Sequence, residues 1–233
     1  MALRNASPSF DHWLGTDKMG RDIFVRILFG ARISLAVGCL AAVINLIVGT
    51  IYGGIAGYVG GKVDMIMMRV VDIIYSVPSM LYIVLIMLIF GASVVSIMLG
   101  ISITCWIDMA RIVRQQVKSL KEQEFTMAAF VLGASSSRIL LKHLLINTMG
   151  QIIVTVTLMV PQAIFTEAWL SFLGVGISAP MASWGTLAQD ARELIMTYPM
   201  QTVYPMIAIC ITIFSFNFVG EGLEKALDPK RKR

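Results

Sequence analysis

Charge is scarce in this chain of 233 residues. Only 14% of the residues are Asp, Glu, Lys or Arg, whereas 57% are hydrophobic, and the mean hydropathy is +0.79. A soluble domain carries about 25% charged residues, so this chain could not cover a water-facing surface and belongs in a bilayer. The net charge of +5 fits membrane topology better than nucleic-acid binding, because the positive residues flank apolar runs.

Cysteine, histidine and catalytic motifs are equally sparse. The three cysteines, Cys39, Cys105 and Cys210, lie far apart in apolar runs, which predicts small buried residues rather than a disulfide framework or a zinc site. Both histidines, His12 and His143, lie outside the spans. The sequence contains no G-x-x-x-x-G-K-[ST], H-E-x-x-H or G-x-S-x-G motif. We therefore expect no Walker-type ATP site, no catalytic residue, and no cofactor-binding or metal site.

Long stretches without charge predict five membrane-spanning helices. The 35 uncharged residues between Asp72 and Asp108 exceed the roughly 20 needed for one crossing. The Gly-Ala-Ser break at 91–93 therefore predicts a helical hairpin, with a kink at Pro78 in its first arm. Residues 168–189 are apolar but interrupted by glycine and proline, which predicts an irregular, partly re-entrant or interfacial segment. The expected spans are 33–56, 69–90, 94–113, 144–166 and 194–220.

Lysine and arginine are unevenly divided between the two sides of such a protein. With the C-terminus inside, the inner segments hold thirteen of these residues and the outer segments six. Because inner loops are enriched in Lys and Arg, we expect a cytoplasmic C-terminus, although five of the six outer charges crowd before residue 33. The expected organisation is an outer arm at 1–32, a membrane domain at 33–220 and a basic cytoplasmic tail at 221–233.

A polar, basic loop at 119–146 lies in the cytoplasm in this topology. Ser119 and Glu122 fit a capping box that starts a helix, and Gly133 is a typical helix end. The helical period places four residues on one face: Phe125, Ala128, Ala129 and Leu132. Small alanines on an exposed face permit close approach by a partner, but an ordinary interfacial amphipathic loop explains the pattern equally well.

A second short helix is expected to follow in the same loop. One of the three serines at 135–137 can cap it, and its apolar residues are Ile139, Leu140 and Leu144. The loop is then a bent pair of short helices between the third and fourth spans.

Four segments of the chain have a distinctive sequence. They are HWLGTDKMGRDIFVRILFGARISL at 12–35, EFTMAAFVLGA at 124–134, TEAWLSFLGVGISAPMASWG at 166–185 and FNFVGEGLEKALDP at 216–229. The second is similar to the permease signature E-A-A-x-x-x-G-x9-I-x-L-P. Together and in this order, the four segments resemble the signatures of ATP-binding-cassette importer permeases of the dipeptide and oligopeptide type. The resemblance runs from about His12 to Pro229 and is closest to the second-permease (C-type) subunit.

This resemblance implies an all-α integral membrane fold, the type I importer transmembrane domain, in the cell (inner) membrane. It implies that the chain forms a translocation path for dipeptides or oligopeptides, together with a sister permease subunit. It also implies two cytoplasmic ATPase subunits, which carry the ATP, and an extracytoplasmic substrate-binding protein. The coupling loop would dock on an ATPase subunit through five residues: Glu124, Ala128, Ala129, Gly133 and Ala134.

The chain departs from the family pattern in three places. Met127 stands where the general signature has Glu, which leaves Glu124 as the acidic residue, as in the peptide subgroup. Ile146 stands where a proline is usual. Family members normally carry a further N-terminal span before the segment at 12–35, and this chain begins too late to contain it.

Several polar residues within or beside the spans have more than one interpretation. Glu167, at the outer end of the fourth span, either lines the translocation path or holds the irregular segment through hydrogen bonds, and we favour the second. Asp108 is expected to pair with Arg111, and Asp72 can face Arg69, each at i,i+3 spacing. Hydrogen bonds between helices are available from Asn45, Thr104, Asn147 and Asn217.

Two alternative functions remain at this point. Related permeases that import nickel or another small solute share these motifs. From a different class, a secondary transporter, a channel or a membrane scaffold would also be hydrophobic, but a secondary transporter usually shows inverted repeats, and no repeat is visible here.

Overall fold

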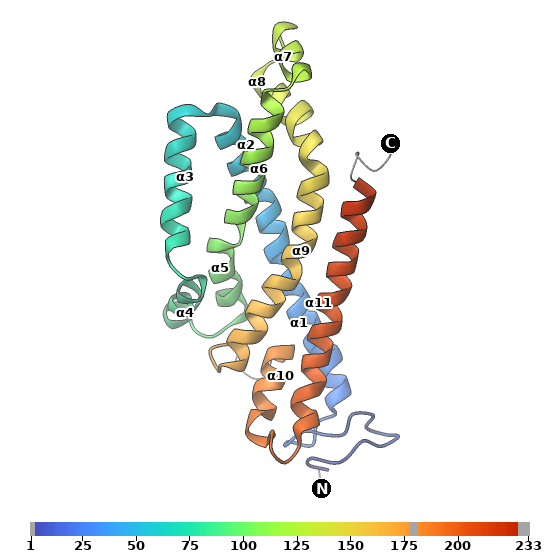
Figure 1. The fold of residues 1–233 in the computed structure, drawn as a ribbon. Coiled ribbons are helices and arrows are strands. Elements are labelled where there is room, and N and C mark those ends of the chain that lie inside the picture. The colour runs from blue at the N-terminus through green and yellow to red at the C-terminus, as the bar shows by residue number, and fades with distance from the viewer. Residues whose placement is uncertain (1–2, 178–180, 228–233) are drawn as a thin grey trace. The chain divides into compact units, whose positions relative to one another are not determined.

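The computed structural model describes residues 3–177 and 181–227, and these residues form helices without any strand (Figure 1). An isolated backbone bridge between Thr16 and Asp22 closes a turn in the N-terminal arm. The helices, including two π-helical segments (η1, η2) and one 3-10 turn (η3), are α1 (Ile23–Ile44), η1 (Asn45–Gly49), α2 (Thr50–Val59), α3 (Gly61–Ser76), α4 (Ser79–Phe90), α5 (Val94–Thr104), α6 (Trp106–Lys121), α7 (Glu124–Val131), α8 (Ser136–Arg138), η2 (Ile139–Leu144), α9 (Leu145–Phe172), α10 (Trp184–Ala191), η3 (Arg192–Leu194) and α11 (Pro199–Leu227).

Among the described residues, four helical stretches are long and apolar enough to cross a membrane. They are Ile23–Val59, Val94–Lys121, Ser136–Phe172 and Pro199–Leu227. A fifth crossing results if α3 and α4, which meet at an angle of 74°, form one broken span. This matches the five predicted spans. The break lies at Val77, which is extended because the next residue is Pro78, as predicted.

Three spans begin earlier than the charge pattern predicted, among them the fourth, which begins at Ser136 rather than near residue 144. The first helix begins at Ile23 rather than near residue 33, because its charged residues have partners. Arg26 pairs with Asp17 and Asp190, and the guanidinium of Arg32 lies 4.6 Å above the ring of Phe29. The hairpin begins at Gly61, directly after a turn at Gly60, rather than near residue 69. Charge alone was therefore a poor marker of these helix starts.

The segment at 168–189 is more regular than predicted. Residues 168–172 are the last turn of α9, and residues from Trp184 onward form α10. Ser183 starts α10 with a capping box, in which Ser183 and Thr186 each accept a hydrogen bond from the other's backbone amide. Between these helices, residues 173–177 and 181–183 are irregular, and residues 178–180 lie outside the described part of the chain.

The chain divides into two compact units. Unit 1 comprises Met1–Leu40, Ile83–Gly100 and Val160–Phe216, and unit 2 comprises Ala41–Tyr82, Ile101–Met159 and Asn217–Arg233. In unit 1, α10 packs beside α1, where the Trp184 indole donates a hydrogen bond to the Ile27 carbonyl over 3.0 Å. Gln201 of α11 fastens the N-terminal arm with hydrogen bonds to Asn5 and to the Thr16 carbonyl, both 3.1 Å long.

Unit 2 has a core built around α6. The buried members of this core are Met109, Val113, Val117, Ala129, Ile139, Leu144 and Ile152. Helix α6 also packs closely against three glycines of η1 and α2, spaced four residues apart: Gly49, Gly53 and Gly57. Small residues at this spacing let helix backbones approach in membranes.

Two of the three cysteines and two of the four predicted interhelical donors differ from the prediction. Cys39 and Cys210 are exposed and Cys105 is half-buried, so the predicted burial is wrong for two of them. An apolar run in a membrane helix can face outward as readily as inward. Asn45 does bond across to another helix, at the Met159 sulfur, but Thr104 and Asn147 donate to carbonyls of their own helices.

Candidate functional site

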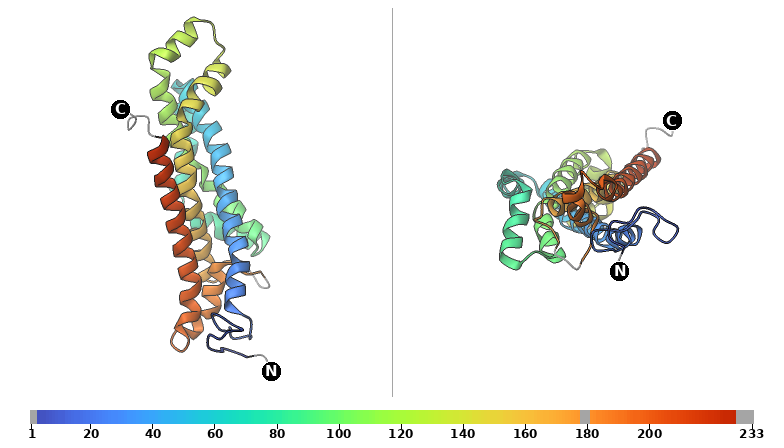
Figure 2. Two further views of the ribbon diagram at one scale, coloured as in Figure 1. Left: turned by 90° about the vertical axis from the view of Figure 1, so that its right-hand side faces the viewer. Right: turned by 90° about the horizontal axis from the view of Figure 1, so that it is seen from below.

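Helix α7 lies at the end of α6, in the loop that joins α6 to α9 within unit 2 (Figures 1 and 2). The predicted capping box is wrong, because Ser119 lies inside α6, which continues to Lys121. Gln123, in an extended conformation, instead occupies the N-cap position, and its carbonyl accepts a hydrogen bond from the Thr126 amide over 3.0 Å. The acidic Glu124 is therefore the first residue of α7 and is exposed to solvent.

One side of α7 is fixed to the unit 2 core. The Thr126 hydroxyl donates a hydrogen bond to the Leu120 carbonyl over 2.8 Å, and Ala129 is buried in the core cluster with Val117 and Ile139. The predicted face is thus divided. Phe125, Ala128 and Leu132 are exposed, whereas Ala129 faces inward. Periodicity grouped these residues but could not indicate which edge of the group packs on α6.

Gly133 ends the helix as predicted. Its φ of 79° lies in the left-handed region, where glycine is favoured. The Gly133 amide donates to the Phe130 carbonyl, and the Ala134 amide donates to the Ala129 carbonyl over 3.1 Å. Ser135 then occupies the N-cap position of α8. The second helix is not a separate short one, because α8 continues through η2 into α9 as one stretch, Ser136–Phe172.

Large apolar side chains cover the outer surface of α7. Their exposed fractions range from 42% for Phe125 to 86% for Leu132. The exposed apolar side chains of this patch, called the α7 patch below, are Phe125, Met127, Phe130, Val131 and Leu132. The helix lies outside the stretches that qualify as membrane spans. Exposed apolar surface of this kind marks a binding site for another protein or a membrane. The helical period did not select three of these residues, Met127, Phe130 and Val131, although the high apolar content of 125–132 indicates them.

Glu167 lies fully buried in unit 1 as a hydrogen-bond acceptor. It receives hydrogen bonds from the Ser34 hydroxyl over 3.1 Å and from the Ser171 hydroxyl over 2.8 Å. The Ser34 hydroxyl oxygen in turn accepts a hydrogen bond from the Trp184 amide over 3.2 Å. Glu167 and Ser34 thus connect α9 and α1 to the first residue of α10, which is the arrangement expected of a structural residue.

Replacing Ser34 by alanine is expected to destabilise unit 1. The substitution leaves the Trp184 amide without its acceptor and removes one donor from Glu167, and each unsatisfied buried group costs about 1–3 kcal/mol. Thermal unfolding in detergent should show a lower midpoint for Ser34→Ala. The control is Ser215→Ala, where an exposed hydroxyl bonds only to its own helix, at the Ile211 carbonyl, and where we expect no change. Equal midpoints for the two variants would contradict this account of Ser34.

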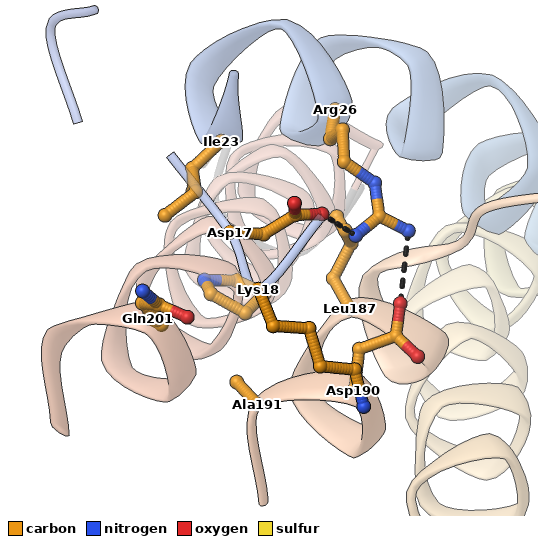
Figure 3. A pocket seen from close by; sticks show the side chains of 9 residues that line it. Asp17, Lys18, Ile23, Arg26, Leu187, Asp190, Ala191 and Gln201 are labelled. Atoms are coloured by element: carbon orange, nitrogen blue, oxygen red, sulfur yellow. Dashed lines mark hydrogen bonds and ion pairs between the residues drawn. The ribbon is translucent and has the colours of Figure 1, made fainter. Parts of the chain in front are cut away.

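A second polar cluster in unit 1 was not predicted. Arg26 donates hydrogen bonds to Asp17 over 2.8 Å and to Asp190 over 3.0 Å, beside a small cavity of about 20 Å³ (Figure 3). Arg21 donates to Asp17 over 2.7 Å. Asp190 lies 164 positions from Arg26, so no local pattern could have revealed this contact. The cluster joins the N-terminal arm and α1 to α10.

Asp17 remains ionised at neutral pH in this cluster. Burial disfavours its charge, but hydrogen bonds from the Arg21 and Met19 amides and from the Arg21 guanidinium outweigh that effect, and the pKa of Asp17 is lowered. A lowered carboxyl pKa in the folded state contributes stability above the unfolded pKa and loses it as the pH falls through the folded value. The attachment of the arm is therefore complete at neutral pH.

The predicted ion pairs of the hairpin are replaced by longer-range ones. Asp72 pairs with Arg111 over 3.1 Å rather than with Arg69, so Asp108 does not hold Arg111. Asp64, which was not singled out, receives hydrogen bonds from Arg114 and Lys118. The long Arg and Lys side chains of α6 thus reach acidic residues of α3 in the same unit instead of forming i,i+3 pairs.

Sequence comparison identifies close relatives over almost the whole chain. The chain is 53% identical to the oligopeptide transport system permease protein OppC of Bacillus subtilis, over 97% of this chain and 74% of that protein. It is 48% identical to the dipeptide transport system permease protein DppC of B. subtilis, over 99% of this chain and 72% of that protein. Identity to OppC of Escherichia coli is 44%, over 98% and 76%.

Two solved structures share the fold at low sequence identity. An inward-facing MetNI methionine ABC transporter matches with a TM-score of 0.71 at 15% identity, covering 88% of this chain and 98% of that one. An amino acid ABC transporter with histidines matches with a TM-score of 0.67 at 14% identity, covering 87% and 94%. These matches confirm the predicted type I importer transmembrane fold.

The family described as "Binding-protein-dependent transport system inner membrane component" matches residues 49–233. Its members are transport components rather than enzymes, in agreement with the expectation from the sequence. With the OppC and DppC relatives, this match covers most of the chain. The chain belongs to this family of binding-protein-dependent inner-membrane permeases, in its OppC/DppC group.

Proposed function

We propose that this chain imports dipeptides or oligopeptides as the C-type permease subunit of an ATP-driven transporter, and that α7 docks on a cytoplasmic ATPase. Identity of 44–53% to OppC proteins supports the peptide substrate. The α7 patch is the observation that carries the docking role, because it is apolar, exposed and outside the spans.

The partners follow from the family and from the exposed surface. A binding-protein-dependent ABC importer works with a substrate-binding protein and an ATPase. Beyond this, we propose one sister permease and two ATPase subunits. The strongly exposed apolar end of α4, at Leu88, Ile89 and Phe90, is available for lipid or for the sister subunit.

In α7 and the turn that follows it, the predicted coupling residues take different roles. Glu124, Ala128 and Gly133 are exposed and can touch an ATPase directly. Ala129 is buried, and Ala134 is partly buried against the same core, so these two hold α7 on unit 2. A push on the α7 patch would therefore reach α6 through Ala129 and through the hydrogen bond from Thr126 to Leu120.

This role of α7 also sets the orientation. The C-terminal end of α11 lies beside the start of α9, where a Cβ placed on Gly150 would be 3.6 Å from Leu227. The start of α9 follows the α7 loop directly. If α7 is cytoplasmic, the C-terminus is too, in the cell (inner) membrane. The loop that carries α7 and the end of α11 at Leu227 are then inside, and the arm that precedes Ile23 is outside. The rest of the predicted basic tail, 228–233, lies outside the described residues.

Transport requires no chemistry in this chain. The substrate-binding protein delivers the substrate. The ATPase pair closes when ATP binds, and this closure displaces α7 together with α6. The two permease subunits then alternate between outward and inward access. Glu167 is assigned a structural role, since it is fully buried and accepts hydrogen bonds from two serines.

Reconstitution tests this proposal. The chain, its sister permease, ATPase and binding protein are placed in proteoliposomes, and uptake of a labelled dipeptide or pentapeptide is measured with ATP or with a non-hydrolysable analogue. We expect uptake only with ATP and only with the binding protein. Uptake of nickel but of neither peptide would replace the substrate assignment. Flux of an ion through the chain alone would contradict the proposal as a whole.

A further inference from the structure

Asp64 is an acidic residue at the start of α3 whose side chain is almost completely enclosed. Only 7% of it is exposed, although α3 is otherwise largely open on its outer side. Two cations of α6 reach it. Arg114 donates from both Nε and Nη2, the latter over 2.6 Å, and the Lys118 ammonium lies 3.4 Å away. A bidentate arginine–carboxylate pair of this kind constrains orientation as well as distance.

Further contacts hold the turn between α2 and α3 to α6. The Lys121 ammonium donates to the Tyr58 carbonyl over 2.7 Å and lies 5.3 Å from the Tyr58 ring centroid. Gly57 fits against α6 so closely that a Cβ there would be 2.7 Å from the Arg114 carbonyl oxygen. The α2–α3 corner, residues 57–64, is thus fastened to the last two turns of α6.

The same turns of α6 carry α7. Leu120 accepts the hydrogen bond of Thr126, and Val117 packs with the buried Ala129. The last turns of α6 therefore contact both α7 and the α2–α3 corner. Asp64 is the only acidic residue among the described contacts that joins these turns to α3, since Asp72 meets α6 further back, at Arg111.

We propose that Asp64 is a positioning residue that makes α3 move with α6 when α7 is displaced. Without the carboxylate, α6 can still move with α7, but α3 no longer follows in a fixed orientation. The proposal rests on the proposed role of α7 and adds to it the route by which displacement reaches the bent helix pair α3–α4. The electrostatic contact is well suited to this role, because Asp64 is enclosed and is screened little by solvent.

The test is the amount of peptide imported per ATP hydrolysed by the complete reconstituted transporter. For Asp64→Asn, we expect the ATPase rate stimulated by binding protein to stay close to wild type while peptide uptake falls. The ratio should drop by about 2- to 30-fold, the range found for residues that transmit coupling between sites. Asp64→Glu, which keeps the charge, should restore the ratio toward wild type.

Asp72→Asn is the matched control. It makes the same chemical change on the same helix and also removes a partner from an arginine of α6, but the Asp72 side chain is 54% exposed. Pairs this exposed contribute little, so the ratio for Asp72→Asn should equal that of wild type.

Two results would overturn the proposal. One is an Asp64→Asn complex that assembles normally and keeps the wild-type ratio. The other is a parallel loss of uptake and ATP hydrolysis with poor recovery of the complex, which would indicate a role in folding alone. Failure of the proposed function looks different, because the wild-type complex itself would then show no ATP-dependent uptake.

Discussion

Replacing Val131 and Leu132 together by serine is expected to abolish stable association with the ATPase. Both side chains are more than 80% exposed and belong to the α7 patch. Full burial of one such side chain is worth about 1.5–3 kcal/mol, so losing two should weaken binding by a factor on the order of a hundred or more. Uptake of peptide should fall with it. Co-purification and titration of purified ATPase against the permease pair measure the effect.

The fold itself should tolerate this double substitution. Exposed positions usually change stability by less than about 0.5 kcal/mol, so the unfolding midpoint in detergent should stay the same. Met196→Ser serves as the control, because Met196 is 94% exposed but lies in unit 1, between η3 and α11. ATPase binding that survives in the Val131/Leu132 variant, or is lost equally in Met196→Ser, would show that the α7 patch is not the docking surface.

Two adjacent glycines of α2 should respond in opposite directions to the same substitution. A Cβ on Gly53 would overlap the carbonyl group of Ala110 on α6, whereas a Cβ on Gly54 would lie 3.5 Å from a methyl group of Leu145, in ordinary contact. Gly53→Ala must therefore push α2 away from α6, at a cost of about 1–3 kcal/mol. Gly54→Ala relieves the entropic cost of glycine in a helix and should stabilise by about 0.5–1 kcal/mol.

Thermal unfolding of the two variants under identical conditions separates these effects. A lower midpoint is expected for Gly53→Ala and a higher one for Gly54→Ala, and a bulkier Gly53→Leu should prevent accumulation of the folded protein. Because both residues lie in one helix, a general effect of composition would move both midpoints the same way. That outcome would contradict the close packing of α2 on α6.

Local patterns predicted those features that depend on neighbouring residues in the chain. The break at Val77 follows from Pro78, and the end of α7 follows from the left-handed conformation of Gly133. The five spans follow from hydropathy, which requires no knowledge of packing. The type of fold and the position of the loop that carries α7 could therefore be predicted.

The features that the sequence did not predict depend on contacts between distant parts of the chain. Ser119 fits a capping box, but α6 continues through it to Lys121, whose ammonium donates to the Tyr58 carbonyl, 63 positions away. Ala129 fits an exposed face, but Val117 and Ile139 enclose it. The partners of Asp64 lie 50 and 54 positions away. Periodicity gives the spacing of side chains on a helix, not the direction from which a neighbour approaches.

Crosslinking from position 128 tests the central claim most directly, namely that α7 touches an ATPase in the cytoplasm. Ala128 is exposed at the edge of the α7 patch, so Ala128→Cys is introduced into a chain whose own three cysteines, Cys39, Cys105 and Cys210, are replaced. A short thiol-to-amine crosslinker should join this position to an ATPase subunit in inside-out vesicles. If a membrane-impermeant maleimide labels it from outside intact cells, and no ATPase is ever captured, α7 cannot be the site where ATP hydrolysis acts on this permease.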